Sequence, residues 1–406
     1  MPVERSTFAR KKMKGLGLSQ WGIIIILSFL TALEPLSTDL YLPGFIAISE
    51  TFNVSVASVQ ISLSTFLGGF ALGQLFWGPL ADRFGRKKPI LLSLLIFILA
   101  SLACAHVKTI EQLWGVRFIQ AFGGCGGVVI SRSIITDYFK KDQTLKMFSI
   151  LAMIMGIAPI IAPSLGNIIL KFLSWRGLFG ILAIFGALFF VLTLFFLPET
   201  NKNPVKSETN VLKGYLNILK VRKFFIYSLV AGIANGILMI YTSTGPFLIL
   251  EIAGLSKDMF SLIFAINAVG LMIGSSIISF LQKYIVPKKI VKYTLFIMTL
   301  ASVVMLIIIS MDISKSLILS VFFIYLFTIV FSIGILFPTT TDLAITPFSG
   351  SSGTASSLFG AIQIATAFVC TLISSLMMDG TILTIGIEFF LCCVVGFVVL
   401  FAKIKN

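Results

Sequence analysis

The sequence predicts an all-α membrane protein with about twelve transmembrane helices in two pseudo-symmetric halves of six. Of the 406 residues, 57% are hydrophobic and 12% are charged, which is too few charges to cover a soluble protein of this size. Apolar runs of about 20 residues, long enough to cross a bilayer as helix, recur between Trp21 and Ala402. The longest polar stretch, Glu199–Arg222, separates the sixth run from the seventh.

The expected spans divide equally around that polar stretch. We assign residues 1–198 to an N-terminal six-helix half, 199–223 to a linker and 224–406 to a C-terminal six-helix half. The predicted spans are 21–43, 57–80, 89–107, 111–136, 146–172, 176–197, 224–250, 259–282, 290–310, 316–340, 353–377 and 381–402.

Basic residues are distributed unequally between the two sides of these spans. Of the 31 Lys and Arg residues, 24 lie at the two termini, in the linker or in the connections on the same side. Two lie within a span, and the opposite connections hold five, namely Lys108, Lys171, Arg176, Lys257 and Lys315. Basic segments tend to remain in the cytoplasm, so we expect a multi-pass protein of the bacterial inner (cytoplasmic) membrane with both termini cytoplasmic.

The composition argues against several other classes of protein. The net charge of +15 sits in short clusters between apolar runs, so we expect no nucleic-acid partner. The five cysteines lie inside apolar runs, and the single histidine gives no metal-ligand spacing with them. No nucleophile–base pair is evident in a loop. We therefore predict that the protein is not an enzyme and needs no metal or other cofactor.

The connection between the second and third spans, Gly78–Lys88, is the strongest local motif. It reads Gly-Pro-Leu-Ala-Asp-Arg-Phe-Gly-Arg-Lys-Lys and includes Asp82, Arg83, Gly85 and Arg86. Gly85 permits a tight reversal, and the basic residues hold the loop at the anionic inner leaflet. Asp82 serves no topological purpose among these bases, which favours a functional role over a plain basic turn.

Two acids, Glu34 and Asp39, lie within the first span. An ionisable residue in a span costs about 3 kcal/mol, so we interpret both as functional. Five residues separate them, about 140° around a helix, so they do not share one narrow face. The alternative for either acid is a hydrogen-bonding residue between helices, and Asp39 has a further alternative as a cap near the outer end of its helix.

Arg117 lies about six residues inside the fourth span, at a depth close to that of Asp39. A guanidinium cannot lose its proton, so it must be paired or hydrated. The arginine is followed by glycines that let another helix approach closely, at positions 123, 124, 126 and 127.

Several stretches together resemble a known family. The connection at 78–88 is similar to the signature loop of the major facilitator superfamily, and Leu-Ser-Thr-Asp-Leu-Tyr-Leu-Pro resembles the first-helix sequence of its Bcr/CflA group of twelve-span drug:proton antiporters. Further similar stretches are 117–126, 131–137, 158–167, 245–247, 264–268 and 353–358, so the resemblance covers essentially the whole chain.

The resemblance implies a major facilitator fold and roles for particular residues. Asp82 would cap the N-terminus of the helix that begins near Ser352–Thr354, which would close the cytoplasmic side, and Arg86 would pair with Asp137. Arg117 would belong to a proton-coupling network with the acids of the first span. A fixed ion pair that holds two helices together is the alternative for Arg117.

A motif of small and kinking residues in the fifth span implies the direction of transport. It consists of Gly156, Pro159, Pro163 and Gly166, and it is similar to the antiporter motif of exporters. Asn167 replaces a second glycine of that motif, which predicts looser helix packing there.

The expected function is proton-coupled efflux of drugs or small amphipathic metabolites, with the proton gradient as the energy source. A proton symporter that imports a small metabolite is the alternative, and a membrane scaffold without transport would not need its buried charges. The expected partners are a small-molecule substrate, protons and membrane lipid, and we expect a monomer.

Overall fold

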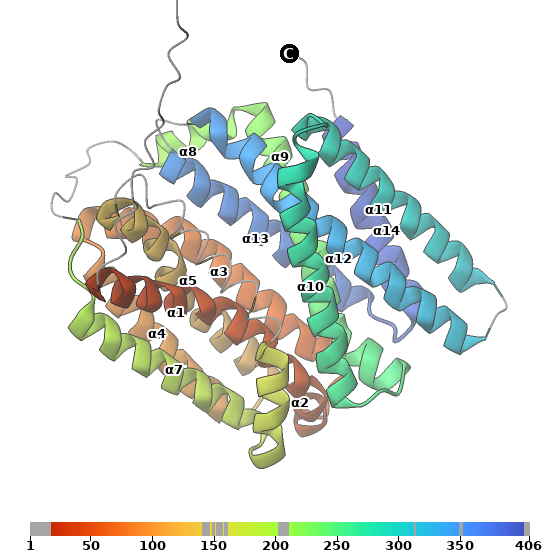
Figure 1. The fold of residues 1–406 in the computed structure, drawn as a ribbon. Helices are drawn as coiled ribbons and strands as arrows, with labels where there is room; N and C mark the ends of the chain where they lie inside the picture. The colour runs from red at the N-terminus through yellow and green to blue at the C-terminus, as the bar shows by residue number, and fades with distance from the viewer. Residues whose placement is uncertain are drawn as a thin grey trace, which may run out of the picture.

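The computed structural model describes residues 18–139, 161–201, 211–311, 314–348 and 352–401, together with 147, 151 and 157. These residues fold as helices joined by short connections (Figure 1). The first part of the chain forms α1 (Leu18–Asp39), η1 (Leu42–Gly44), α2 (Phe45–Phe52), α3 (Val56–Phe84), α4 (Lys87–His106), α5 (Ile110–Tyr138), α7 (Trp175–Phe196) and α8 (Val211–Leu219). The second part forms α9 (Arg222–Pro246), η2 (Phe247–Ile252), α10 (Lys257–Leu281), α11 (Pro287–Ser310), α12 (Lys315–Ile345), η3 (Thr346–Phe348), α13 (Ser352–Met377) and α14 (Ile382–Phe401).

Most of these helices are long and apolar enough to cross a membrane. In the described ranges there are 11 such helices, and each matches a predicted span in order. The remaining predicted span, 146–172, lies partly outside the described residues, and its described end forms the shorter apolar helix Ile161–Phe172. The predicted all-α transmembrane fold is therefore confirmed.

Close backbone contacts set the packing within each half of the chain. A Cβ atom at Gly69 of α3 would lie 2.1 Å from the carbonyl oxygen of Phe118 in α5. Gly274 of α10 meets the carbonyl of Phe331 in α12 in the same way, and Gly334 of α12 meets that of Leu271. Only a residue without a side chain allows such an approach, so glycines fix corresponding helix pairs in both halves.

Helices α1–α5 and α7 lie together in the lower left of Figure 1, and α9–α14 lie above and to the right of them. Helix α3 packs along α13 across the boundary between these groups. Ser357 donates to the carbonyl of Gln74 at 3.0 Å near one end of this contact, and Gln60 donates to Ser374 at 3.1 Å near the other. We call the end of the bundle that carries α8 the linker side.

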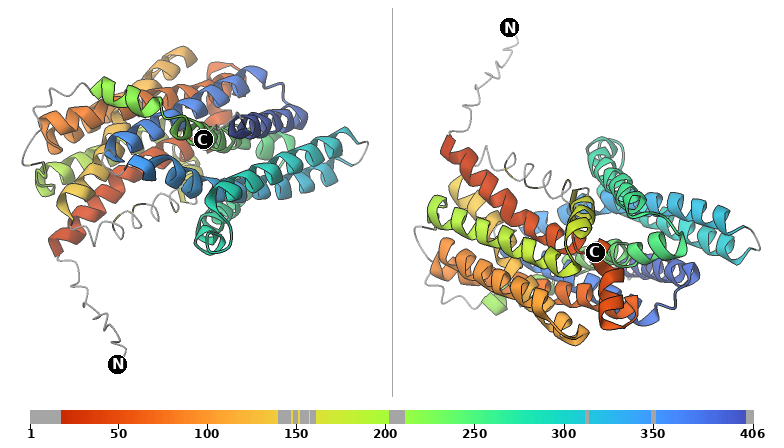
Figure 2. Two further views of the ribbon diagram at one scale, coloured as in Figure 1. Left: turned by 90° about the horizontal axis from the view of Figure 1, so that it is seen from above. Right: turned by 90° about the horizontal axis from the view of Figure 1, so that it is seen from below.

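The polar stretch between the halves contains a helix that the sequence analysis did not predict. Helix α8 buries Ile218 against a small apolar cluster that includes Phe224 of α9 and Leu358 and Phe359 of α13. Figure 2 shows α8 in light green across the linker side of the bundle. The linker is therefore partly docked on the second half, because one face of an otherwise polar segment carries apolar residues.

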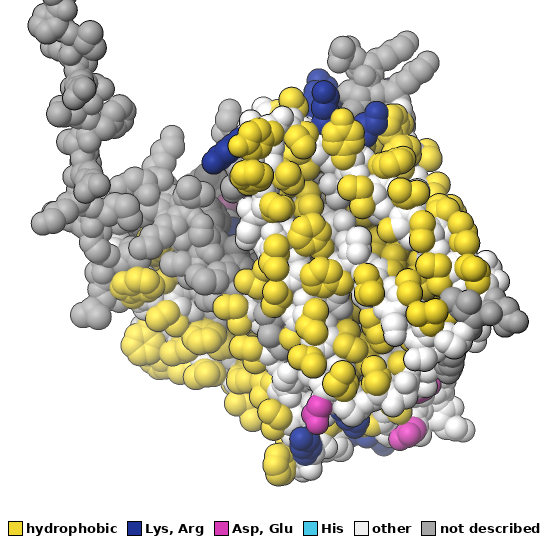
Figure 3. All heavy atoms as spheres, turned by 45° about the vertical axis from the view of Figure 1, so that its right-hand side comes forward, with side chains coloured by type: hydrophobic (Ala, Val, Ile, Leu, Met, Phe, Trp, Pro, Cys, Tyr) yellow, Lys and Arg dark blue, Asp and Glu magenta, His cyan; other side chains and the backbone are white. Residues whose placement is uncertain are grey.

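The outer surface of the bundle is apolar. Hydrophobic side chains cover the face shown in Figure 3, and Lys, Arg, Asp and Glu are confined to its upper and lower ends. Large side chains such as Leu99, Ile184 and Ile324 are more than half exposed. Exposing apolar surface along whole helices is unfavourable in water but favourable in lipid. This surface is therefore typical of a membrane-spanning bundle.

Candidate proton-coupling site and loop gate

The two acids of α1 face different surroundings. Glu34 is partly buried and interacts electrostatically with Arg132 of α5. Asp39 is 4% exposed, ends α1, and accepts a hydrogen bond from Thr38 at 3.0 Å. The predicted angular separation of the acids explains this difference, because residues five apart point to different sides of a helix.

Asp39 lies close to the second half of the chain. It interacts electrostatically with Tyr241 of α9, whose hydroxyl accepts a hydrogen bond from Asn267 of α10 at 2.9 Å. In the part of the chain that the structure describes, no Lys or Arg forms an ion pair with Asp39. Asp39 is thus a buried carboxyl group near the boundary between the halves, with no fixed cation to hold it ionised.

Arg117 is completely buried in an aromatic cage. Its guanidinium carbon lies 4.2 Å from the ring centroid of Phe66, 4.7 Å from that of Tyr41 and 5.7 Å from that of Phe179. Its Nη1 atom donates to Gln120 at 2.6 Å. Aromatic faces attract a desolvated guanidinium, so the cage replaces part of the hydration that the cation has lost.

The remaining contact of Arg117 is with α1. Its Nη2 atom donates to the backbone carbonyl of Ser37 at 3.1 Å, and no described carboxylate is within ion-pair distance of it. The alternative of a fixed ion pair is therefore wrong for the described chain, although Arg117 does tie two helices together. The physical reason is that the cage and a free carbonyl at the end of α1 compensate the charge without an acid.

The glycines that follow Arg117 hold α5 against its neighbours, as predicted. A Cβ atom at Gly123 would lie 2.6 Å from the backbone nitrogen of Phe97 in α4. At Gly126 it would lie 2.4 Å from Ser93, and at Gly127 it would contact Leu30 of α1. These contacts keep α1, α4 and α5 in close register around the arginine.

The helix that ends at Phe172 also packs closely beside Asp39. A Cβ atom at Gly166 would lie 2.2 Å from the carbonyl oxygen of Leu40, the residue after Asp39. Pro163 is buried in the same helix, whereas Gly156 and Pro159 lie outside the described residues. The packing prediction for this motif is thus met at Gly166.

Asn167, which departs from the motif, makes a contact that the sequence analysis did not foresee. Its Nδ2 atom donates to Asp258 at 2.9 Å, at the start of α10. The amide thus adds a hydrogen bond between the two halves at this position, and the expectation of looser helix packing there stays a prediction.

Arg86 is the centre of the Gly78–Lys88 connection. Its Nε donates to Asp137 at the end of α5 at 2.8 Å, and its Nη1 donates to Asp82. Partial burial opposes its charge, but the two carboxylates raise the pKa of Arg86 above its ordinary value. The pair with Asp137 is the one that the resemblance implied.

Three other members of the predicted gate are more loosely placed. Gly78 faces Ser357 of α13 at ordinary contact distance, and the exposed Arg83 lies over the ring of Phe84. The Asp82 side chain is 61% exposed and pairs with Arg86. Its predicted capping of α13 has no counterpart among the described hydrogen bonds and stays a prediction.

Glu199, at the start of the linker, is a member of this cluster that the sequence analysis missed. Its carboxylate accepts hydrogen bonds from the backbone N–H groups of Arg86 and Lys87 at 2.9 and 3.1 Å, so it caps the start of α4. A Cβ atom at Gly85 would lie 2.6 Å from that carboxylate, and Gly85 has a φ of +86°. The sequence signal for this role is an acidic residue at the start of a linker rich in basic residues. It was missed because Glu199 is far from the loop along the chain.

Comparison with known proteins identifies the family of the chain. A family model of the Major Facilitator Superfamily matches residues 27–369. The chain belongs to the Major Facilitator Superfamily. This member is 32% identical over 395 residues to an uncharacterized MFS-type transporter, YdgK, of Bacillus subtilis, with 96% of this chain and 97% of the relative covered.

Two further similarities extend this result. This chain is 30% identical to a bicyclomycin resistance protein homolog of Haemophilus influenzae, with 88% of this chain and 89% of the relative covered. Its fold resembles the crystal structure of a D-xylose–proton symporter with a TM-score of 0.77, covering 95% and 97% of the two chains. The identity to that symporter is 14%, so this likeness concerns the fold alone.

Proposed function

We propose that this protein is a proton-coupled exporter of drugs or small amphipathic metabolites in the bacterial inner membrane, with both termini in the cytoplasm. The observation that carries the proposal is the similarity to a bicyclomycin resistance protein homolog over 88% of this chain. The buried carboxyl group of Asp39, which forms no ion pair among the described residues, supports it. Burying such a carboxyl group in a membrane span costs free energy, so its presence indicates a function.

In this proposal Asp39 is the main proton site. Within the described chain, Asp39 has no Lys or Arg among its electrostatic partners, whereas Glu34 interacts with Arg132 of α5. An acid without a fixed cation can exist in both protonation states. Protonation of Asp39 would compete with substrate near Tyr241, at the boundary between the halves. Each charge that enters with the gradient contributes about 2.3 kcal/mol per 100 mV to transport.

Arg117 has a positioning role in the same scheme. Its hydrogen bond to Ser37 holds the end of α1 two residues before Asp39, and its cage keeps the cation away from the carboxyl group. A proton on Asp39 would therefore change the charge near the second half without breaking an ion pair inside the first half. Such a change favours movement of one half relative to the other.

Direct transport in inverted membrane vesicles tests the proposal. Vesicles from an efflux-deficient bacterial strain that carries the gene are energised until their interior is acidic, and bicyclomycin, ethidium and a panel of amphipathic drugs are added. We expect accumulation of at least one compound, and release of protons from the vesicles when it is added. Substrate accumulation in vesicles of native orientation, driven by an inward proton gradient, would support import and contradict the proposal.

A further inference from the structure

Glu388 is a buried acid in α14 that has no place in the scheme above. It is 5% exposed, and its carboxylate accepts a hydrogen bond from Ser374 of α13 at 2.7 Å. No Lys or Arg within the described ranges forms an ion pair with it. A carboxylate in the last span without a cation is as costly as Asp39, so it also calls for a functional explanation.

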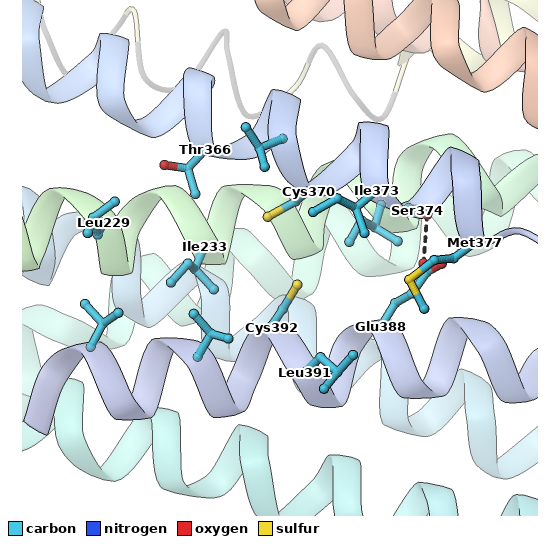
Figure 4. A pocket seen from close by; sticks show the side chains of 14 residues that line it. Leu229, Ile233, Thr366, Cys370, Ile373, Ser374, Met377, Glu388, Leu391 and Cys392 are labelled. Carbon is cyan, nitrogen blue, oxygen red and sulfur yellow. Dashed lines mark hydrogen bonds between the residues drawn. The ribbon is translucent and has the colours of Figure 1, made fainter.

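A cavity of about 370 Å³ lies beside this carboxylate, between α9, α13 and α14. Figure 4 shows Glu388 at one end of it, with Cys370 and Cys392 facing each other across its middle and Ile233 and Leu229 towards the other end. Its walls are hydrophobic except for Glu388, its partner Ser374, Thr366 and the two thiols. The site thus combines an apolar chamber with one acidic group.

The cavity opens on the outer, lipid-facing surface of the second half. Four of its lining side chains, Val369, Ile373, Leu391 and Val395, are about half exposed, at 49%, 50%, 46% and 50%. They belong to the apolar exterior of the bundle, whereas Asp39 and Arg117 are buried within the first half. A molecule dissolved in the bilayer would therefore reach Glu388 without passing through the region of Asp39.

We propose that this cavity is a second binding site, which takes an amphipathic organic cation from the bilayer and places its charge against Glu388. The chemistry of the walls selects this class, because the chamber excludes hydrated ions while the carboxylate lacks a cation of its own. A neutral lipid chain would fill the apolar part but leave the acid unpaired.

Ser374 connects this site to the contact between the two halves. Its hydroxyl donates to Glu388 and accepts a hydrogen bond from Gln60 of α3 at 3.1 Å, and Gln60 also donates to Ser243 of α9 at 2.9 Å. A purely structural role would require Glu388 as a hydrogen-bond acceptor, which a glutamine also supplies. The charge of Glu388 is needed for the cation alone.

Protection of Cys392 from N-ethylmaleimide tests the proposal with the full chain in lipid nanodiscs. The labelled fraction of each native cysteine is measured by mass spectrometry with and without ethidium, and pyrene serves as a neutral aromatic probe. We expect saturating ethidium to slow the labelling of Cys392 at least fivefold in the wild-type chain and pyrene to have less than a twofold effect. Cys104 and Cys125 lie outside the cavity and are fully buried, so they should stay unlabelled with and without ethidium if the fold is intact.

Two variants distinguish this site from the one proposed around Asp39. Glu388→Gln keeps an acceptor for Ser374 and should lose the protection by ethidium, whereas Asp39→Asn should keep it. Equal protection in Glu388→Gln and wild type, equal protection by pyrene, absence of protection, or its loss in Asp39→Asn would each overturn the proposal. Because the readout is binding, a failure of drug export in vesicles leaves this result unaffected.

Discussion

The guanidinium of Arg117 donates to the backbone carbonyl of Ser37, two residues before Asp39 on the same helix. The buried cation and the buried acid are therefore joined through the α1 backbone rather than through an ion pair. Because α1 ends at Asp39, that carbonyl has no partner within the helix, and the arginine supplies one. This link fixes the end of α1 without engaging the carboxyl group of Asp39.

The aromatic cage predicts which partners of Arg117 matter for stability. In a double-mutant cycle on thermal unfolding, Arg117→Ala and Phe66→Leu should show a coupling of about 1 kcal/mol, because the guanidinium lies 4.2 Å from that ring. Arg117→Ala and Asp39→Ala should couple less, since no ion pair joins them. Strong coupling with Asp39 and additivity with Phe66 would contradict the cage.

The hydrogen bond between Asn167 and Asp258 predicts a conformational effect. Asn167→Gly restores the glycine of the antiporter motif and removes a bond between the halves that is worth about 1 kcal/mol, so the state in which these residues are apart should gain about fivefold in population. Spin labels on the ends of α7 and α10 opposite the linker side report this shift as a longer distance. Asp258→Asn, which keeps an acceptor, is the control, and an unchanged distance distribution in Asn167→Gly would contradict the prediction.

The two carboxylates on Arg86 should contribute unequally to stability. The Asp137 side chain is 27% exposed and that of Asp82 is 61% exposed, and exposed ion pairs contribute little. We expect Asp82→Asn to lower the free energy of unfolding by at most about 1 kcal/mol and Asp137→Asn to lower it by more. Melting of the purified variants in detergent measures both, and the reverse order would contradict this account of the loop.

The hydrogen bonds of Glu199 predict that the stability conferred by the same loop depends on pH. Partial burial raises its pKa, but hydrogen bonds from the backbone N–H groups of Arg86, Asn201 and Lys87 outweigh burial and lower the pKa below the ordinary 4.5. A lowered pKa in the folded state means that the stabilisation is present above pH 4.5 and is lost as the pH falls through the folded value.

The corresponding experiment compares the melting temperatures of the wild type and Glu199→Gln between pH 8 and pH 4. The wild type should be more stable at pH 7, and the difference should shrink below about pH 4.5. Gly85→Ala tests the backbone of the same loop. We expect it to lower the free energy of unfolding by roughly 1–3 kcal/mol, because the backbone conformation of Gly85 is almost restricted to glycine. A difference that grows towards acid would contradict the assigned role of Glu199.

The helices and the close contacts of glycine could be predicted from the sequence because they depend on local patterns. Apolar runs of bilayer length give the spans, and small residues at helical spacing give the contacts of Gly123 and Gly126. The Arg86–Asp137 pair followed from a family motif. Helix α8 was missed because its short apolar face lies in a segment whose average composition is polar.

The surroundings of the buried charges depend on contacts between distant helices and could not be read from the chain. Phe66 and Phe179, which enclose Arg117, come from α3 and α7, and nothing in their local sequence distinguishes them among 39 phenylalanines. Glu388 is different, because the rule that singled out Glu34 and Asp39 applies to it equally. The sequence therefore carried a signal for Glu388 in the last span, but it carried no signal for the cavity beside it.

Gradient-driven transport by Asp39→Asn tests the central claim most directly. Purified wild type, Asp39→Asn and Glu34→Gln are placed in liposomes with a substrate found in the vesicle screen, and transport is measured with and without a proton gradient. We expect Asp39→Asn to bind substrate and equilibrate it down its own gradient but to lose uphill transport, while Glu34→Gln retains it. Uphill transport by Asp39→Asn at the wild-type level would contradict the account.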